Sequence, residues 1–287
     1  MLEGLIRSLS RQITDSLFSM SIVVVDNDST GSARETAQRL EEELGLDLTY
    51  SIETERTIPA VRNHALRVAK GDHIGIIDDD EFAPNHWLIT LYRAMQTFNV
   101  DGALGPVHPF FESTPPDWLI KSGFCERPVY RTGTLLKWNQ TRTGNVLLKR
   151  DVFDRHGLRF DETMRTGGTD REFFKHAMQQ GSRFVAVEEA PVYEVVPQER
   201  WTKSYYFRRA LVNGFNAYKN NREGRRGLRR VTEPAKSALA VAAYAAAAPV
   251  CTCLGTHRLM NCAVRGGHHL SQLCALAGIE LVKRRDF

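Results

Sequence analysis

Apolar residues in the first third of the chain follow two spacings, one helical and one typical of short buried strands. Apolar positions three or four apart predict an amphipathic helix from Leu2 to Leu17. Short β-branched runs between turn residues and charged segments predict strands at 21–25, 48–52, 74–78 and 103–107, with helices at 33–44, 58–69 and 85–97. This alternation of strand and helix predicts an α/β fold on a doubly wound, mostly parallel sheet.

The middle of the chain, residues 110–142, has no clear periodicity and is rich in proline, glycine and aromatic residues. Irregular segments of this length in a compact domain usually bind something. Regular spacing then returns, with strands expected at 145–149, 183–187 and 192–196 and helices at 169–180 and 201–219. We therefore expect one α/β domain over residues 1–220.

Residues 221–287 have a different composition, and we expect a basic linker followed by an alanine-rich helical tail. The uncharged stretch 237–254 contains Pro249 and, at ~1.5 Å per residue, falls slightly short of a ~30 Å hydrocarbon core. We therefore expect it to lie in a membrane interface or in a packed hairpin rather than to span a bilayer. The arginines before it favour an anionic membrane surface: Arg222, Arg225, Arg226, Arg229 and Arg230. A pair of terminal helices packed on the α/β domain is the alternative.

The composition is that of a soluble globular protein, with 42% hydrophobic residues, 25% charged residues and a net charge of +4. Positive charge is concentrated around residues 200–230, but nothing there resembles a nucleic-acid-binding module, so no nucleic-acid partner is expected. The five cysteines match no structural zinc pattern well, which favours free thiols in a reducing cytoplasm. Charged residues interrupt the apolar pattern at the N-terminus, unlike a secretory signal peptide.

Three aspartates and a glutamate, Asp78 to Glu81, follow the strand expected at 74–78. Like charges in this position repel one another unless a cation neutralises them. In open α/β sheets, ligands bind at the carboxyl ends of the strands. Oxygen ligands at such a place suit Mg²⁺ or Mn²⁺ holding a phosphate-bearing substrate. The alternative is a solvated acidic loop before a helix, because aspartate favours helix N-caps.

Four motifs occur in order along the chain: Val23–Asp28 (VVVDND), Ile58–Asn63 (IPAVRN), Ile77–Glu81 (IDDDE) and Gly167–Phe174 (GGTDREFF). Their order and spacing resemble the inverting GT-A glycosyltransferases of family 2, in particular the exopolysaccharide glucosyltransferases of succinoglycan type. The resemblance extends over about residues 26–208. It implies a metal-dependent enzyme that moves a hexose from a UDP-sugar to a glycan or lipid-linked acceptor. The setting would be cell-surface polysaccharide synthesis in bacteria, at the inner face of the cell membrane.

The resemblance also assigns roles in the donor site. Asp26 would accept a hydrogen bond from uracil N3–H, although it can instead cap the following helix. Arg62 would hold the base or the pyrophosphate through its several donors, and its alternative role is that of a surface cation. Asp80, with Asp78 nearby in a D-x-D motif, would bind the Mg²⁺ or Mn²⁺ that bridges the diphosphate. Asp79 would contact ribose or uracil.

Asp170 is the residue that the resemblance assigns as the general base. In an inverting displacement, one carboxylate removes the proton of the acceptor hydroxyl while the diphosphate leaves from the opposite face. Gly167 and Gly168 would leave room for close approach of a sugar. The alternative is that Thr169 and Asp170 only cap the helix that starts there. Glu172 is the second candidate for the base.

The N-terminal region departs from the family pattern. In the family the first element is an apolar strand in the middle of the sheet, whereas here Met1 falls inside the helix expected to follow that strand. Without it, the facing edges of two buried strands would lose roughly 1–3 kcal/mol for each unsatisfied backbone group. We therefore hypothesise that the sequence is N-terminally truncated relative to the family and that its sheet lacks the first strand. An inactive relic of such an enzyme is one alternative. A sugar nucleotidyltransferase is another, although no glycine-rich phosphate loop is found near the N-terminus.

Overall fold

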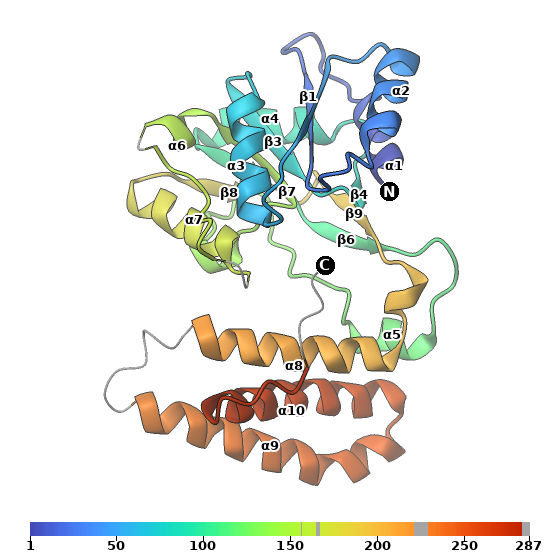
Figure 1. The fold of residues 1–287 in the computed structure, drawn as a ribbon, viewed down its shortest axis with the longest axis vertical. Coiled ribbons are helices and arrows are strands. Elements are labelled where there is room, and N and C mark those ends of the chain that lie inside the picture. The colour runs from blue at the N-terminus through green and yellow to red at the C-terminus, as the bar shows by residue number, and fades with distance from the viewer. Residues whose placement is uncertain (156, 165–166, 221–228, 283–287) are drawn as a thin grey trace. The chain divides into compact units, whose positions relative to one another are not determined.

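The strands and most of the shorter helices belong to one unit of the chain, and the long C-terminal helices belong to another. In a computed structural model, residues 1–155, 157–164, 167–220 and 229–282 are described. Met1–Phe110 and Arg127–Val195 form the first unit, and Phe111–Glu126 and Val196–Phe287 form the second (Figure 1). The helix expected at 201–219 therefore groups with the tail, and the expected basic linker at 221–228 lies outside the described residues.

The first unit contains the predicted alternation of strands and helices. Its helices are α1 (Leu2–Leu9), α2 (Arg34–Leu44), α3 (Ile58–Val68), α4 (Trp87–Phe98), α6 (Asp151–Asp154) and α7 (Thr169–Gln179), with a 3₁₀ turn at Trp138–Gln140. Its strands are β1 (Ile22–Asp26), β2 (Leu48–Ile52), β3 (His73–Ile77), β4 (Glu81–Phe82), β5 (Gly102–Leu104), β6 (Val107–Phe110), β7 (Asn145–Lys149), β8 (Phe184–Ala186) and β9 (Val192–Val195).

The first helix is shorter than its apolar spacing predicts. It ends at Leu9 instead of continuing to Leu17, so this prediction was wrong. The backbone of Asp15 and Ser16 adopts left-handed φ angles of 47° and 56°, which an α-helix does not accommodate. Ile13 instead donates its N–H to the carbonyl of Asn85 at 2.8 Å, which ties this segment to the residues before α4.

The strands of the first unit pair in both directions. Among the described residues they form a two-stranded sheet β1-β2, a four-stranded sheet β3-β7-β5-β8 and a three-stranded sheet β4-β9-β6. β1 and β2, β5 and β8, and β6 and β9 run parallel, as expected for strands joined by crossovers. β7 runs antiparallel to both β3 and β5, because it enters the sheet after the long segment between β6 and β7 rather than after one crossover helix.

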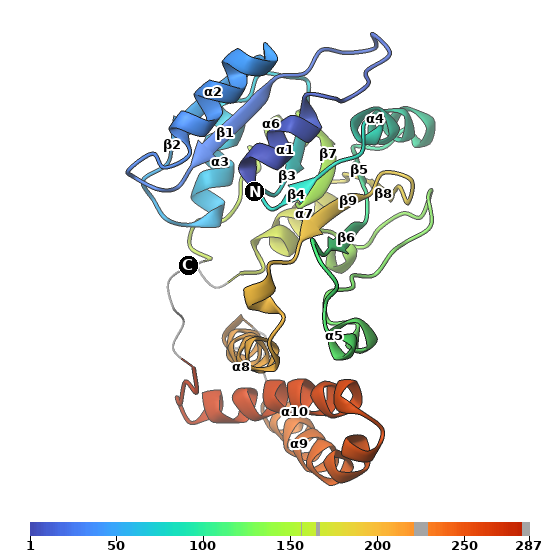
Figure 2. The same cartoon turned by 90° about the vertical axis from the view of Figure 1, so that its right-hand side faces the viewer.

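A large cavity separates β1 from β3. In the described part of the chain β1 pairs only with β2 and β3 only with β7, as expected for a sheet that lacks a strand between them. A cavity of about 1130 Å³ fills this space, bounded by the two strands and by side chains of α1 and α3. Its walls include Ile6 of α1 and Val61 of α3, so the interior is apolar along most of the strand length. Figure 2 shows α1 and α3 beside these strands.

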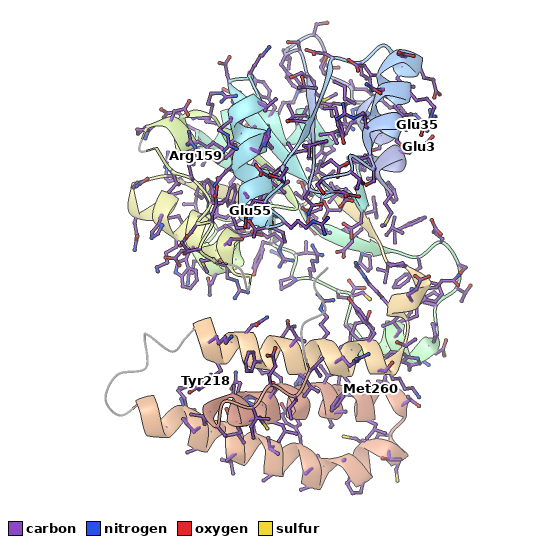
Figure 3. All side chains as sticks on the ribbon, viewed as in Figure 1. Glu3, Glu35, Glu55, Arg159, Tyr218 and Met260 are labelled. Carbon is purple, nitrogen blue, oxygen red and sulfur yellow. The ribbon has the colours of Figure 1, made fainter. Side chains whose placement is uncertain are left out.

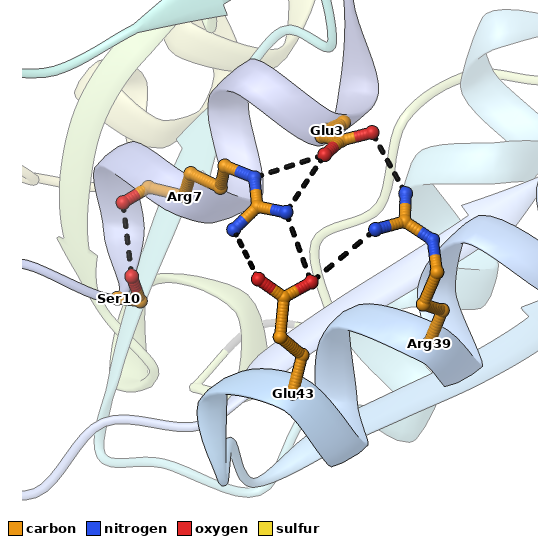
Figure 4. Close-up of polar contacts among 5 residues, drawn as sticks. All are labelled: Glu3, Arg7, Ser10, Arg39 and Glu43. Atoms are coloured by element: carbon orange, nitrogen blue, oxygen red, sulfur yellow. Dashed lines mark hydrogen bonds and ion pairs between the residues drawn. The ribbon is translucent and has the colours of Figure 1, made fainter.

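Four charged side chains join α1 to α2 on the protein surface. Arg7 donates to Glu3 at 2.9 Å and to Glu43 at 2.8 Å, while Arg39 donates to the same two glutamates at 2.7 and 3.3 Å (Figure 4). Each arginine therefore lies between two carboxylates, which lowers the pKa of both glutamates through hydrogen bonds to the guanidinium groups. The network fixes α1 along one side of the cavity.

The second unit is helical and consists of α5 (Asp117–Ser122), a 3₁₀ turn at Gln198–Arg200, α8 (Lys203–Asn220), α9 (Arg229–Cys253) and α10 (Thr256–Leu276). α10 packs against both α8 and α9. Gly214 allows close contact, because a Cβ atom there would lie 2.2 Å from the carbonyl oxygen of His268. Tyr218 on α8 and Met260 on α10 mark this unit in Figure 3.

Candidate active site

The cavity between β1 and β3 brings together all five residues predicted for the donor site. Asp26 lies at the end of β1, Arg62 lies on α3, and Asp78, Asp79 and Asp80 follow β3; each of them lines the cavity. The carboxyl ends of two neighbouring strands and one helix turn therefore meet at a single opening, where ligands bind in open α/β sheets. The cavity is large enough for a nucleotide-sized ligand.

Asp78 is accessible through the cavity but surrounded by protein atoms. Its side chain is 44% exposed, and burial nevertheless raises its pKa, partly opposed by the positive charge of Arg62. The accessible face is the one that lines the cavity, so a ligand there meets a partly desolvated carboxyl group. Asp79 is exposed and Asp80 is half-buried.

Glu81 points into the protein rather than into solvent. It is 2% exposed, and its Oε2 accepts the backbone N–H of Asp78 at 3.1 Å. Within the described residues its Oε1 has no hydrogen-bond partner. Burial, and next the negative charge of Asp78, raise the pKa of Glu81 to about 9, so this side chain is neutral at pH 7. Glu81 therefore supports the turn after β3 without adding a fourth negative charge to it.

Asp26 is held by several protein donors. It is 8% exposed; its Oδ2 accepts from the hydroxyl of Tyr50 at 2.8 Å and from the N–H of Ala33 at 2.9 Å, and its Oδ1 accepts from the N–H of Asp28 at 2.9 Å. Ala33 is the N-cap residue of α2, so Asp26 supports the start of that helix, as its alternative role predicts. A carboxylate has about four acceptor positions, which leaves about one for a ligand.

Arg62 connects the donor site to Asp170. One of its terminal nitrogens, Nη1, forms a short ion pair with Oδ1 of Asp170, and Nη2 lies 3.7 Å from Oδ1 of Asp78. The side chain is 15% exposed, and its guanidinium lies over the ring of Phe160, 5.4 Å from the ring centre. Arg62 is therefore a buried connector between two carboxylates, which rules out the alternative of a surface cation.

Both carboxylate oxygens of Asp170 have protein partners. Its Oδ2 accepts from the hydroxyl of Thr143 at 2.9 Å and from the Thr143 N–H at 3.3 Å, while Oδ1 faces Arg62. The N-cap of α7 is Gly168, which makes no side-chain cap and has a left-handed φ of 92°. Thr169 and Asp170 lie inside the helix, so capping does not explain the carboxylate, which contacts Arg62 and Thr143 instead.

Glu172, the second candidate for the base, has different partners. Its carboxylate contacts Lys175 at 3.1 Å and His176 at 3.2 Å, both on α7. These contacts lie along the helix itself, whereas Asp170 joins α7 to α3 and to the residues before β7. Asp170 is therefore the carboxylate of this motif that is linked to the predicted donor site.

The carboxylates that follow β3 at this cavity suit a hard divalent cation. Within the described residues, no group of three or more His, Cys, Asp or Glu side chains is arranged to hold a metal ion unaided. Mg²⁺ is commonly bound by one or two carboxylates together with substrate phosphates, and Asp78 and Asp80 can supply the protein part of such a set. The neighbouring Gly144 leaves space there, because a Cβ atom at this position would lie 3.0 Å from Oδ2 of Asp78.

Thr143 is a site residue that sequence reasoning missed. It is fully buried and comes just before β7, where its hydroxyl meets Asp170. Nothing local distinguishes it from other polar residues at strand ends, because its partner lies 27 positions further along the chain. Its contribution is visible only once α7 is placed beside β7.

The fold is that of the GT-A glycosyltransferases. The crystal structure of S. aureus TarS 1-349 in complex with UDP matches with a TM-score of 0.54 at 15% identity, covering 97% of this chain and 88% of that one. The TarS 1-349 structure in complex with UDP-GlcNAc matches with the same TM-score of 0.54 at 14% identity, covering 96% and 88%. At these identities the likeness concerns the fold alone.

The sequence comparison gives the family. Residues 1–157, more than half of the chain, match glycosyl transferase family 2, and the chain belongs to this family. It is 28% identical over 284 residues to the succinoglycan biosynthesis protein ExoM of Rhizobium meliloti (strain 1021), covering 97% of this chain and 90% of ExoM. The succinoglycan biosynthesis protein ExoU of the same organism is 26% identical over 183 residues, covering 57% of this chain and 50% of ExoU.

Proposed function

We propose that the protein is an inverting, metal-dependent glycosyltransferase that moves a hexose from a UDP-sugar to a glycan or lipid-linked acceptor in cell-surface polysaccharide synthesis. The observation that carries this proposal is the cavity lined by Asp26, Arg62, Asp78, Asp79 and Asp80. Two further facts support it: relatives act in succinoglycan biosynthesis by name, and TarS, which shares the fold, binds UDP and UDP-GlcNAc.

In this proposal, the protein's residues have separate tasks. Asp26 and Asp79 bind the uridine, Arg62 binds the diphosphate, and Asp80 with Asp78 holds Mg²⁺ or Mn²⁺. The cation would stabilise the negative charge that develops on the departing UDP. Asp170 would remove the proton of the acceptor hydroxyl, and attack from its side of the sugar would give inversion.

UDP release tests the assignment. The full chain would be incubated with a panel of UDP-sugars and Mn²⁺, together with Asp80→Ala and Asp170→Asn. We expect release with at least one donor, and a large loss of it in both variants. Release that survives both substitutions would exclude this mechanism.

A protein with this fold but no activity is the second candidate, and the breadth of the cavity favours it. The facing edges of β1 and β3 are unpaired over the described residues, so one wall of the proposed uridine site is wide open. Turnover of UDP-sugars distinguishes the two candidates: the enzyme releases UDP from at least one donor, whereas the inactive protein releases UDP from none of them.

We further propose that the helical unit binds the cytoplasmic face of the membrane. One helix, Thr232–Cys253, is long and apolar enough to cross a bilayer by length and composition, and 6% of its most apolar window is buried. Leu239 and Val250 on this helix are 72% and 62% exposed. Because Pro234 and Pro249 lie within the helix and an arginine-rich segment precedes it, we favour a position in the lipid interface. Sedimentation with anionic and with neutral vesicles tests this, and equal binding to both would contradict an electrostatic contribution.

A further inference from the structure

Arg142 is a half-buried cation without an obvious purpose in the fold. It lies between the 3₁₀ turn at Trp138–Gln140 and β7, and both neighbours, Thr141 and Thr143, are buried at 4% and 0% exposure. Within the described residues its guanidinium forms neither a hydrogen bond nor an ion pair. An unpaired charge removed from water is costly, so such a group normally has an anionic partner.

Among the described residues, the lining of the cleft beside Arg142 contains two arginines and no acidic residue. A small cleft of about 30 Å³ is lined by Arg142 together with Arg127, Tyr130 and Gln140, and its remaining lining is mostly apolar side chains and prolines. Arg127 already forms an ion pair with Glu194, so Glu194 is not available as a separate counter-ion for Arg142. Burial lowers the pKa of Arg142 and the positive charge of Arg127 lowers it further, while Tyr130 and Asp170 act in the opposite direction. The cleft therefore carries an excess of positive charge that an anion would relieve.

The residue that follows Arg142 in the chain contacts the proposed base. Thr143, the next residue, donates to Asp170 through both its hydroxyl and its N–H. A ligand group held by Arg142 would thus lie on the side of the site where Asp170 is positioned. Arginine presents a planar set of donors that matches the oxygens of a phosphate group in geometry and charge.

We propose that Arg142 binds a phosphate group of a substrate, at a subsite formed with the cleft beside Arg127. This inference rests on the proposed function, because the transfer of a sugar from a UDP-sugar supplies phosphate from two sources. The phosphate belongs either to the diphosphate of the donor or to the diphosphate of a lipid-linked acceptor. Arg142 would contact phosphate oxygens in either case.

Binding of inorganic pyrophosphate to the full-length chain tests the subsite without turnover. Calorimetry would compare the wild type with Arg142→Gln, Arg142→Lys and the control Arg131→Gln, which removes one exposed positive charge from the same segment. We expect binding about 10- to 100-fold weaker in Arg142→Gln, an intermediate loss in Arg142→Lys, and wild-type binding in the control. Circular dichroism and melting curves would establish that each variant is folded; if Arg142→Gln is not, the Lys variant carries the comparison.

Two further measurements identify the source of the phosphate. If it is the donor, Arg142→Gln weakens UDP binding to the same extent and leaves uridine binding unchanged. If it is the acceptor, UDP binding stays at the wild-type level and the KM rises for a diphosphate-linked acceptor but not for a neutral glycan. The proposal would be overturned if a folded Arg142→Gln variant had pyrophosphate binding, UDP binding and acceptor KM all within twofold of the wild-type values. Failure of the proposed function is recognised separately, by UDP release that persists in Asp80→Ala and Asp170→Asn.

Discussion

Arg62 and Asp170 form an ion pair across 108 positions of the chain. The same guanidinium lies 3.7 Å from Asp78, so one side chain joins the acid-tipped end of β3 to the start of α7. The proposed metal site and the proposed base therefore share the positive charge of Arg62. A change at either carboxylate is expected to affect the other, because both interact with the same guanidinium group.

Replacing Arg62 with alanine is expected to weaken both folding and donor binding. Asp78 and Asp170 would lose a charged partner at a site where Arg62 is only 15% exposed. Loss of a hydrogen bond to a charged group at such a site costs about 1–3 kcal/mol. Urea unfolding and UDP titration would measure the two effects. Arg62→Lys keeps the positive charge but lacks the planar set of donors, so its stability and its UDP affinity should lie between those of the wild type and Arg62→Ala. Equal stability of all three proteins would contradict the structural role.

Asp170→Asn is expected to lower kcat by about 10²- to 10⁴-fold, the usual contribution of a general base. Asparagine keeps the shape of the side chain and can still accept from Thr143, but it cannot take a proton. Donor KM should therefore change much less than kcat. Glu172→Gln is the matched control on the same helix, since its ion pairs with Lys175 and His176 lie apart from Arg62. A larger loss in Glu172→Gln than in Asp170→Asn would reverse the assignment of the base.

Thr143→Val tests whether Asp170 must be held in place. Valine has nearly the shape of threonine but lacks the hydroxyl that donates to Asp170 at 2.9 Å. We expect kcat to fall by about 10-fold, in line with the loss of one hydrogen bond to a charged acceptor. Thr143→Ser retains the hydroxyl and should recover most of the activity, and unchanged kcat in the valine variant would show that the contact is dispensable.

His73 makes folding stability depend on pH. Burial lowers its pKa below the ordinary value of 6.5; the positive charge of Lys149 acts in the same direction, and Asp72 opposes both. The imidazole of the folded protein therefore takes up a proton at lower pH than that of the unfolded chain. The contribution of His73 to stability is unchanged above pH 6.5 and is lost as the pH falls from 6.5 through the pKa of the folded state.

His73→Phe removes this titration and keeps an aromatic ring beside Tyr92, whose ring centre lies 5.5 Å away. Urea unfolding at pH 7.5 and pH 5.5 would compare the two proteins. We expect the wild type to lose more stability than the variant between these two values. An equal loss would mean that other groups govern the acid sensitivity.

Most strand positions could be predicted closely from the sequence, but the strand expected at 103–107 was wrong, because the structure has two strands there, β5 and β6, in different sheets. β2 and β7 have the expected bounds, because β7 contains a buried apolar run and β2 is rich in β-branched and aromatic residues that favour strands. α1 could not be predicted to its end, since Ile13 and Leu17 continue the apolar spacing but are 36% and 53% exposed. The antiparallel direction of β7 could not be predicted either, because it depends on where the chain re-enters the sheet after the long segment that precedes β7.

The donor-site residues could also be predicted, because acids at the ends of neighbouring strands meet at one edge of a sheet. The cavity confirms that Asp26, Arg62, Asp78, Asp79 and Asp80 share one opening, while their separate roles stay predictions. Thr143 and Arg142 carried no comparable signal. Both are polar residues just before β7, and only their neighbours in the folded structure indicate a role for them.

The edges of β1 and β3, which face each other without pairing in the described part of the chain, also bear on how this protein behaves at high concentration. Open backbone edges lined by apolar side chains can accept an extended segment from another molecule, and this is a route to aggregation. Such a segment would enter the same space that Asp26 and Asp78 line. Self-association and the proposed nucleotide binding would then be mutually exclusive, so adding UDP is expected to reduce self-association.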